Sequence, residues 1–306
     1  MSNFLLIGGG GFVGTNFNFF IKANDLGKIV NLDNGRLTTN KVNFTKFDVN
    51  IRPIEDLIPF LRNADIVINF AAITRVEESI KDPANSFQIN VNIHLKICEA
   101  LRVLKVKENK NIKFLFISTG GAIAGETKKI IDETILPRPI SLYGASKLSC
   151  ESLGYSYSKS FNLDIRNLRF TNIYGPHSDH KESVIARFIK LIIKKEKIEI
   201  RDQGLMKRDF IYIQDVCNAI YKMINKGKPG LTVQFGYGKS YSIIDIFKIL
   251  DRLSPGAESY FAKSLEGEVS SVECNIKFAE KTLDWYPEHS LEYGINKTWD
   301  YFNKKL

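Results

Sequence analysis

The chain has 306 residues, of which 44% are hydrophobic and 25% are charged, a composition typical of a globular protein with a large core. Its formal net charge of +9 comes mostly from scattered lysines. That distribution favours a solvated surface over a nucleic-acid site and supports only a general attraction for anionic, phosphate-bearing substrates. No apolar run is long enough to span a bilayer, so we expect no membrane partner.

The four cysteines lie far apart along the chain, without Cys-x-x-Cys spacing or clustered histidines. This pattern argues against both a metal site and a disulfide framework, and it indicates a reducing compartment, the cytoplasm. Residues 1–7 already form the first predicted strand, so we expect no signal peptide in front of it.

The first predicted element is a buried strand over residues 4–7, followed by four glycines and a helix that begins near Phe12. Glycine lets the backbone turn tightly, so that a pyrophosphate can approach the N–H groups at the helix N-terminus. The glycines fit two registers, and sequence alone does not choose between Gly9-x-Gly11-x-x-Gly14 and Gly8-x-x-Gly11-x-x-Gly14. The pattern predicts a dinucleotide-binding start, and the lack of Gly-Lys-Ser/Thr argues against a nucleoside-triphosphate P-loop.

Asp33 ends the second predicted strand, which covers residues 28–33. A carboxylate about 20 residues beyond the glycine turn is placed to accept both hydroxyls of an adenosine ribose. It would repel a 2′-phosphate, so the sequence favours NAD over NADP, although Arg36 nearby leaves NADP open. The alternative is that Asp33 only opens the Asp-Asn-Gly turn that follows the strand.

The next two predicted strands also end in residues of interest. The first alternates over residues 42–49, and Asp48 would either meet the adenine edge or cap the helix predicted at 54–61. The second is continuously apolar and leads into Ala71 and Ala72, whose small side chains would let the backbone pass close to a cofactor.

A long helix is predicted at about 85–106, with Asn90 near its start, and the buried strand at 113–119 ends in Ser118 and Thr119. Strands thus alternate with helical segments through the first 120 residues. This order predicts an α/β fold built on a doubly wound, Rossmann-type parallel sheet. Because ligands of such sheets bind beyond the carboxyl ends of the strands, we expect the residues at these strand ends to meet at one site.

Tyr143 and Lys147 begin the helix that follows this strand. Four residues apart, they share a helix face, so the ammonium can lie beside the phenol and lower its pKa from about 10 towards neutrality. A phenolate could then take a proton from a carbinol while a hydride leaves its carbon. Three other pairs share the spacing: Tyr155/Lys159, Tyr293/Lys297 and Tyr301/Lys305. None of them begins a helix after a strand that ends in Ser/Thr, so we interpret them as surface residues.

With these motifs in place, the sequence resembles the extended short-chain dehydrogenase/reductases that act on nucleotide sugars, with the UDP-glucose 4-epimerase type nearest. The resemblance covers nearly the whole chain and depends on seven motifs in order. They are Gly8-Gly-Gly-Gly-Phe-Val-Gly14, Leu32-Asp-Asn34, Asn69-Phe-Ala-Ala72, Ile117-Ser-Thr119, Tyr143-x-x-x-Lys147, Leu168-Arg-Phe-Thr-Asn-Ile-Tyr-Gly-Pro176 and Arg208-Asp-Phe-Ile-Tyr-Ile-Gln-Asp-Val216. The tail, with Gly267-Glu-Val269 and residues 283–294, resembles the closing helices of the family.

The resemblance implies roles for individual residues. Tyr143 would be the general base, Lys147 would bind the nicotinamide ribose and lower the tyrosine pKa, and Ser118 or Thr119 would bond the reacting sugar oxygen. The residues that it assigns to the cofactor NAD are Gly8, Gly11, Phe12, Val13, Gly14, Asp33, Asn34, Asp48, Val49, Ala71, Ala72, Asn90, Tyr143 and Lys147. No metal is required, because the phenolate, ammonium and hydroxyl supply the acid–base chemistry.

Two residues are implied in binding the nucleotide-sugar substrate, together with Thr119. Asn172 resembles the family's contact to the substrate phosphates, and Arg208 resembles the arginine that grips the diphosphate, for which a planar guanidinium is suited. The alternative for Arg208 is a local surface ion pair with Asp209.

The resemblance also implies the organisation of the chain. Residues 1–173 would form an NAD-binding Rossmann domain and residues 174–306 a smaller, nucleotide-sugar-binding α/β domain. The segment at about 210–237 is expected to return to the first domain. A homodimer through a helix pair is usual in this family.

The preferred hypothesis is an NAD-dependent nucleotide-sugar 4-epimerase, most simply of a UDP-sugar, acting through a transient 4-keto sugar. A 4-ketoreductase that consumes NAD(P)H needs the same side chains, and the motifs do not separate the two. A 4,6-dehydratase is disfavoured because Gly120-Gly121 stand where that branch has Asp-Glu. A non-catalytic NAD(H)-binding sensor would usually lose the tyrosine or the lysine, and this chain keeps both.

Three departures from the family pattern leave the sugar open. Ala124 precedes Gly125 where members often have tyrosine, which removes an aromatic ring from the sugar pocket. Aligning on Gly125 places Gly120 where the catalytic hydroxyl usually falls, so Thr119 serves if the loop carries one extra residue. Residues 264–266 replace an arginine that commonly provides a second diphosphate contact.

Overall fold

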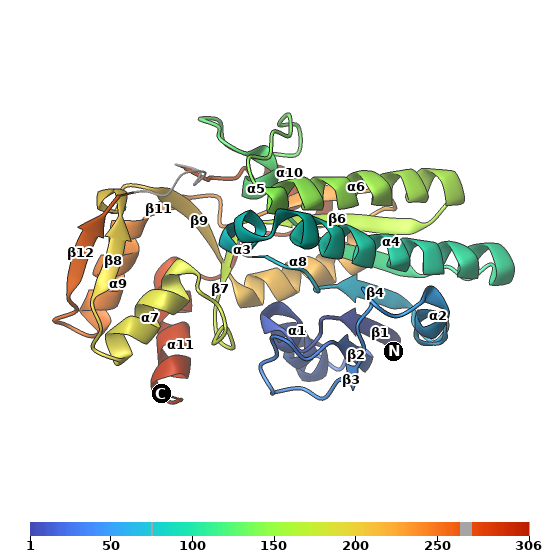
Figure 1. Ribbon diagram of the computed structural model, residues 1–306, viewed down its shortest axis with the longest axis horizontal. Coiled ribbons are helices and arrows are strands. Elements are labelled where there is room, and N and C mark those ends of the chain that lie inside the picture. Colours follow the sequence, from blue (N-terminus) through green and yellow to red (C-terminus); the bar gives the residue numbers. More distant parts are fainter. Residues whose placement is uncertain (75, 264–270, 306) are drawn as a thin grey trace.

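The computed structural model describes residues 1–74, 76–263 and 271–305. Within these residues, seven parallel strands form a central sheet with helices on both faces (Figure 1). In spatial order they are β10 (Thr232–Phe235), β6 (Asp164–Phe170), β5 (Lys113–Thr119), β4 (Ile66–Asn69), β1 (Ser2–Ile7), β2 (Gly27–Asp33) and β3 (Thr45–Lys46). The doubly wound, Rossmann-type sheet predicted from the sequence is confirmed.

The two faces of the central strands pack into separate cores. On β1, Phe4 and Leu6 pack with the helices of one layer, and Leu5 and Ile7 pack with those of the other. The strands are continuously apolar because helices cover both of their faces. The helices of the first layer are α1 (Phe12–Ala23) and α8 (Ile213–Lys226), and those of the second are α2 (Ile54–Arg62), α4 (Pro83–Glu108) and α6 (Leu142–Phe161).

The strand expected at residues 42–49 is much shorter in the structure. Only Thr45 and Lys46 pair with the end of β2, because β3 is the outer strand and the chain turns again at Asp48. Asp48 accepts from the N–H of Asn50 at 2.9 Å, and such a local bond competes with continued pairing.

The chain after β6 builds a smaller region beside the large sheet (Figure 1). β6 runs almost directly into β7 (Asn172–Tyr174), which pairs in parallel with β9 (Lys207–Tyr212), and β9 leads directly into α8 of the large sheet. The remaining elements after β6 are β8 (Ile198–Arg201), β11 (Ser240–Ser242), β12 (Ser259–Ala262), α7 (Val184–Ile193), α9 (Ile243–Leu253), α10 (Lys277–Leu283), α11 (Leu291–Asn303) and a 3₁₀ turn, η1 (Asp202–Gly204). Before β6, the chain also forms two short helices, α3 (Val76–Lys81) and α5 (Gly121–Ala124). Among the described helices, none is long and apolar enough to cross a membrane.

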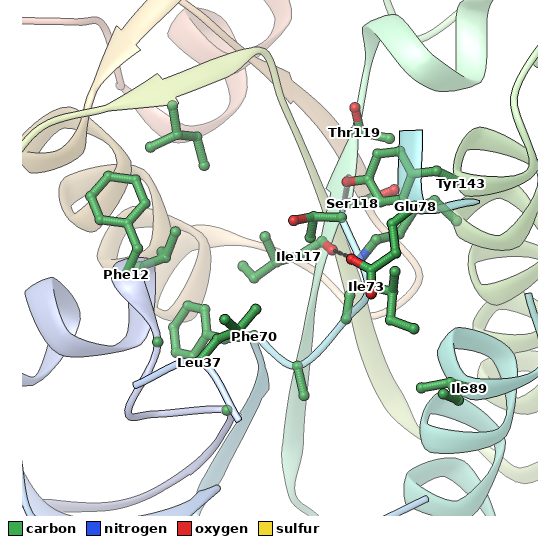
Figure 2. Close-up of a pocket in the computed structure, with 18 of the residues that line it drawn as sticks. Phe12, Leu37, Phe70, Ile73, Glu78, Ile89, Ile117, Ser118, Thr119 and Tyr143 are labelled. Atoms are coloured by element: carbon green, nitrogen blue, oxygen red, sulfur yellow. Dashed lines mark hydrogen bonds between the residues drawn. The ribbon is translucent and has the colours of Figure 1, made fainter. Parts of the chain in front are cut away.

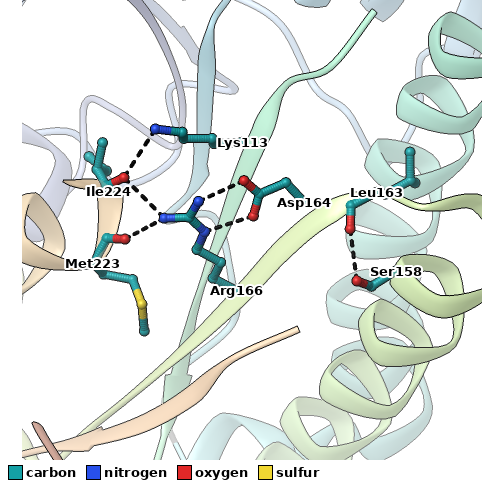
Figure 3. A network of polar contacts seen from close by, with 7 residues as sticks. All are labelled: Lys113, Ser158, Leu163, Asp164, Arg166, Met223 and Ile224. Carbon is teal, nitrogen blue, oxygen red and sulfur yellow. Dashed lines mark hydrogen bonds and ion pairs between the residues drawn. The ribbon is translucent and has the colours of Figure 1, made fainter. Parts of the chain in front are cut away.

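A buried arginine fastens the C-terminal end of α8 to the sheet (Figure 3). Arg166 of β6 is 3% exposed and forms a bidentate ion pair with Asp164 at 2.6 and 2.7 Å. Its other nitrogen donates to the carbonyls of Met223 and Ile224 at 2.5 and 3.0 Å. Lys113 also donates to Ile224, at 3.2 Å. These cations provide donors for carbonyls of the last turn, of which that of Met223 also accepts from the N–H of Gly227 at 3.0 Å, and they complement the negative end of the helix dipole.

Replacing Arg166 with methionine is expected to lower the free energy of unfolding by about 3 kcal/mol, because it leaves the carboxylate of Asp164 without its ion-pair partner and removes the bonds to two carbonyls of α8. The matched control is Arg62→Met, which removes a bidentate pair with Glu108 at the surface, where one side chain is 51% and the other 36% exposed. That change should cost less than about 1 kcal/mol. Thermal unfolding of the two variants compares the pairs directly, and equal losses would contradict the role of Arg166.

Candidate active site

A large cavity lies where the strands of the central sheet end, and its volume is about 1060 Å³ (Figure 2). Segments far apart in the sequence meet in its wall, from the glycine turn after β1 to β9 of the smaller region. The residues predicted for the site that line it are Gly8, Gly11, Phe12, Val13, Gly14, Asp33, Asn34, Asp48, Val49, Ala71, Ala72, Ser118, Thr119, Tyr143, Lys147, Asn172 and Arg208. Asn90 is the predicted site residue that does not line it.

The glycine turn is shaped by close packing at two positions and by open space at a third. Gly8 has a φ of +74°, and a Cβ there would lie 2.6 Å from the backbone nitrogen of Ala71. A Cβ at Gly14 would lie 2.7 Å from the backbone of Gly9. At Gly11, the N-cap of α1, the nearest atom would be 3.4 Å away, so glycine there keeps the helix N-terminus open towards the cavity.

The turn uses the register Gly8-x-x-Gly11-x-x-Gly14. These three glycines line the cavity, whereas a Cβ at Gly9 would strike the side chain of Asn31 at 2.2 Å. The exposed N–H groups of α1 and the space left at Gly11 fit a pyrophosphate. The lining of the cavity thus favours the second of the two registers that the sequence left open.

Asp33 both opens a turn and lines the cavity, so opening the turn does not take it away from the site. Its carboxylate accepts from Gly35 at 2.8 Å and from Gly10 at 3.0 Å. Burial raises the pKa of this carboxyl, against the backbone N–H groups that favour its charged form. Asn34 donates to Asp48 at 3.3 Å on the same rim. Two acidic side chains on one rim fit ribose hydroxyls better than a 2′-phosphate.

The helix-capping alternative for Asp48 is wrong. The N-cap of α2 is Pro53, which has no side-chain acceptor, and the carboxylate of Asp48 accepts instead from Asn50 and Asn34. Asp48 therefore remains at the cavity rim.

Asn90 lies behind the cavity wall and supports it. Its amide accepts from the N–H of Ile73 at 2.8 Å and donates to the carbonyl of Ile73 and to the hydroxyl of Ser146, at 3.1 and 3.0 Å. Because these bonds use both ends of the amide, Asn90 ties the loop after β4 to the start of α6. Asn90 is expected from the sequence to contact the cofactor, but it supports the cavity wall from behind instead of lining it. The sequence motif could not distinguish these two positions.

The two candidate hydroxyls at the end of β5 have different partners. Ser118 is buried and donates to Glu151 on α6 at 2.5 Å. Thr119 is half-buried and lies beside Tyr143 at one end of the cavity (Figure 2), and its hydroxyl favours the charged form of the phenol. Thr119 is therefore the hydroxyl that the structure brings to the tyrosine.

Tyr143 begins α6, whose N-cap Ser141 accepts from Gly144 at 3.1 Å. One turn later, Lys147 is only 4% exposed and donates to the carbonyl of Ile117 at 2.8 Å. Its ammonium lies 4.6 Å from the centre of the Phe116 ring and 5.9 Å from that of Tyr143. The pair thus has the expected arrangement on one face of the helix.

The expected lowering of the tyrosine pKa is wrong for this arrangement. Burial raises the pKa of Tyr143 to about 12, and the hydrogen bond with Thr119 only partly opposes it. Burial also lowers the pKa of Lys147 to about 8. Desolvation disfavours both charged forms, and helical spacing alone could not reveal how deeply the pair is buried.

Asn172 and Arg208 reach the cavity from neighbouring strands of the smaller region. The amide nitrogen of Asn172 donates to the backbone carbonyl of Asp209 at 3.0 Å. Arg208 is half-buried and donates to the carbonyl of Lys207 at 2.8 Å. The carboxylate of Asp209 is buried and accepts from Thr171, Tyr237 and Gly238, so the local Arg208–Asp209 ion pair is not the arrangement found.

The other three Tyr–Lys pairs lie outside the cavity lining. In each, the lysine ammonium lies over the ring of its tyrosine, at 5.3 to 5.9 Å from the ring centre. Tyr301 and Lys305 both bond to Asp179, at 2.8 and 2.7 Å, which fastens α11 to a loop. Tyr155 and Tyr293 are exposed, as expected for surface residues, whereas Tyr301 is half-buried.

The sequence reasoning missed two charged residues that line the cavity, one on a short helix and one on a loop. Glu78 of α3 is placed at the end that holds Tyr143 (Figure 2), and Lys181 donates to Thr74 at 3.2 Å. Neither belongs to a recognisable motif, so only the fold could reveal them. Gly267-Glu-Val269 and residues 264–266 lie outside the described residues. Within the described ranges, no group of three or more His, Cys, Asp or Glu side chains could hold a metal ion.

Comparisons with known proteins agree with this geometry. The model of a family described as NAD dependent epimerase/dehydratase matches residues 4–236. A Methanocaldococcus jannaschii protein, provisionally named a UDP-glucose 4-epimerase, is 32% identical over 304 residues, which cover 96% of each chain.

Two crystal structures are similar over the whole chain. Thermotoga maritima UDP-glucose 4-epimerase, with UDP-glucose, is 29% identical with a TM-score of 0.90, and the match covers 99% of both chains. Bacillus cereus UDP-glucuronic acid 4-epimerase, in complex with UDP-glucuronic acid and NAD, is 28% identical with a TM-score of 0.89 and covers 99% of this chain and 100% of that one.

Proposed function

Because this chain belongs to the NAD-dependent epimerase/dehydratase family, we propose that it is an NAD-dependent 4-epimerase of a nucleotide sugar, most simply a UDP-sugar. The observation that carries the proposal is the single cavity in which the glycine turn and Asp33 lie with Thr119, Tyr143 and Lys147. Asn172 and Arg208 join it from the smaller region. Such a cavity can hold a dinucleotide and a sugar nucleotide together.

In the proposed reaction, bound NAD supplies the group that accepts a hydride from C4 of the sugar and returns it. Thr119 and Tyr143 bond the 4-hydroxyl, and Tyr143 takes its proton as the ketone forms. Lys147 stays charged below pH 8 and holds the nicotinamide ribose. Arg208 and Asn172 keep the diphosphate in place while the 4-keto sugar rotates, so that its opposite face receives the hydride.

The fit of the chain to a dehydratase is poor for a steric reason. That branch needs acidic side chains after the Ser/Thr strand, where this chain has Gly120 and Gly121. A Cβ at Gly120 would lie 2.1 Å from the side-chain oxygen of Gln234, which is itself buried. The loop therefore has no room for the carboxylate at that position.

The direct test is to incubate the purified protein, without added cofactor, with UDP-glucose, UDP-galactose, their N-acetyl forms and UDP-glucuronate, and to follow the configuration at C4 by proton NMR. Interconversion supports the epimerase with retained NAD and identifies its sugar. If the protein shows no interconversion but consumes added NAD(P)H stoichiometrically while reducing 4-keto sugar nucleotides, the 4-ketoreductase would replace the epimerase as the proposed function. No detectable activity in either assay would favour the non-catalytic NAD(H)-binding sensor.

Thr119→Val is expected to lower kcat by about 10²-fold, because it removes the hydroxyl beside Tyr143 and keeps the shape of the side chain. Ser118→Ala should cost only about 10-fold, because Ser118 donates to Glu151 rather than to Tyr143 and its loss acts through the position of the strand. Steady-state kinetics on the two variants decide between the hydroxyls. A larger loss for Ser118→Ala would contradict the assignment.

Arg208→Ala is expected to raise KM for the sugar nucleotide about 10- to 100-fold, because charge-assisted bonds to a diphosphate are lost. The affinity for NAD should change little. Arg52→Ala, which removes an exposed arginine paired with Asp56, is the control for net charge. Parallel titrations with the sugar nucleotide and with NADH measure both affinities, and an equal loss of the two would point to a folding role instead.

Organisation and location are part of the proposal. We assign NAD binding to residues 1–173 with the segment at about 210–237, and sugar-nucleotide binding to residues 174–306; the pairing of β10 with β6 supports this division. We expect a homodimer, which sedimentation velocity tests. The four cysteines are free and buried, which suits the reducing cytoplasm.

A further inference from the structure

α6 is joined to the end of β5 at three successive points. Residues 117 and 118 of the strand bond to Lys147 and Glu151, and Thr119 lies beside Tyr143 (Figure 2). The three helix residues recur every four positions along one face of the helix. The first and third contacts hold the side chains of the proposed chemistry. The second joins the hydroxyl of Ser118 to the carboxylate of Glu151, and the reaction as described makes no use of it.

Glu151 is also half of a buried ion pair. Arg169 of β6 binds it in a bidentate manner, with distances of 2.7, 3.0 and 3.1 Å, and the two residues are 7% and 6% exposed. Arg169 is the partner of Ser118 in the pairing of β5 with β6. Glu151 therefore bridges, from the helix above, two side chains that are neighbours across the sheet.

A buried ion pair is a costly way to attach a helix to a sheet. Removing two charges from water offsets much of their attraction, and apolar residues of similar volume often give equal stability. A charged pair does, however, impose a fixed geometry through its paired hydrogen bonds. This one lies one turn from Lys147 and two turns from Tyr143, where a fixed geometry affects the reacting groups.

We propose that Glu151 is a positioning residue: by accepting from Ser118 and pairing with Arg169, it sets the end of β5 against α6 so that Thr119 meets Tyr143 and the carbonyl of Ile117 meets Lys147. The inference rests on the proposed function, in which Tyr143 and Lys147 act on substrate and cofactor. Glu151 touches neither and acts through the strand. Ser118 is then held on the helix side, and Thr119 alone is left to face the tyrosine.

The test uses two double variants in which no buried charge loses its partner. Glu151→Leu with Arg169→Met replaces the ion pair by apolar side chains, so the fold should keep a melting temperature near that of the wild type. Glu151→Gln with Arg169→Met is matched to it but keeps an oxygen that can accept from Ser118. Thermal unfolding of both variants confirms that any kinetic change is measured on folded protein.

The first variant should lose at least about 10-fold in kcat with little change in KM, because even a small displacement of the reacting groups greatly lowers the rate of the chemical step. The second should recover kcat to within about 3-fold of the wild type, since the acceptor for Ser118 is restored. Adding Ser118→Ala to the first variant should cause no further loss, because both changes break the same contact. Unchanged kcat in the first variant, or an equal fall in both, would overturn the positioning role.

A second measurement tests the positioning role of Glu151 even if the protein is not a 4-epimerase. If the wild type inverts C4 in none of the sugar nucleotides, the variants are compared by NADH affinity in a fluorescence titration, which needs no turnover. The first variant should then bind NADH more weakly than the second, because Lys147 has lost its alignment with Ile117. Equal affinities would overturn the inference about Glu151, whatever the reaction proves to be.

Discussion

Replacing Tyr143 with phenylalanine is expected to lower kcat by about 10³-fold while NAD remains bound, because the change removes one oxygen at the reacting end of the cavity. The phenylalanine ring keeps the packing of the tyrosine beside Lys147, whose ammonium lies 5.9 Å from the ring centre. Burial raises the pKa of the phenol to about 12, so near neutral pH it is a neutral group bonded with Thr119. To act as the base, the phenol must first release its own proton to solvent, and the phenolate then takes the proton of the 4-hydroxyl; a ring without the hydroxyl can do neither.

The matched control for this change is Tyr155→Phe. Tyr155 is on the same helix and is also followed four residues later by a lysine, but its side chain is 53% exposed. It should keep wild-type turnover. Single-turnover kinetics, together with the NAD content of each purified variant, separate chemistry from cofactor loss. Unchanged turnover in Tyr143→Phe, with NAD still present, would exclude the proposed mechanism.

Replacing Lys147 with methionine is expected to reduce activity strongly and, at the same time, to stabilise the fold. The lysine is buried, and its pKa of about 8 lies below the ordinary 10.5, so holding its charge at pH 7 costs roughly 3 kcal/mol. Methionine removes that cost but also the bond to the carbonyl of Ile117, which is worth about 1 kcal/mol. The free energy of unfolding should therefore rise by about 2 kcal/mol at pH 7.

The pH dependence gives this prediction a sign that can be checked. Between about pH 8 and 10.5 the unfolded chain still holds the lysine proton that the folded chain has lost, so the stability of the wild type gains from this group as pH rises. The methionine variant lacks that gain. Activity should move in the opposite direction, because wild-type kcat/KM falls as Lys147 loses its charge above pH 8.

Lys159→Met is the control for this pair of effects. Lys159 follows Tyr155 with the same spacing and is exposed, so its removal should change neither the melting temperature nor kcat. Melting curves and pH–rate profiles of the two methionine variants make the comparison. A destabilised Lys147→Met protein would show that the bond to Ile117 outweighs the burial of the charge.

The features that sequence patterns predicted well are those that local geometry determines. The apolar run before Gly8 and the helical spacing after Gly11 specify a strand, a turn and a helix without reference to the rest of the chain. Asp33 and Thr119 are brought together because the carboxyl ends of parallel strands meet at one edge of a sheet. The site could therefore be located before its walls were known.

The features that the sequence left open depend on burial and on contacts between distant segments. Ser118 and Thr119 are equivalent as a motif, and only the buried carboxylate of Glu151 distinguishes them. Asn90 matched a cofactor motif, yet its amide is used by the loop after β4. The pKa of Tyr143 moved upwards rather than downwards because desolvation outweighs its hydrogen bond, and spacing carries no information about desolvation.

The path of the chain between the large sheet and the smaller region limits how such a protein can diversify. The chain leaves the sheet after β6, comes back through β9 and α8, adds β10 beside β6, and leaves again. No single cut separates the two regions, so neither can be exchanged as a module by one recombination event. A new sugar preference would have to arise by substitutions and loop changes within an intact frame, and chimaeras of relatives need at least three junctions to be viable.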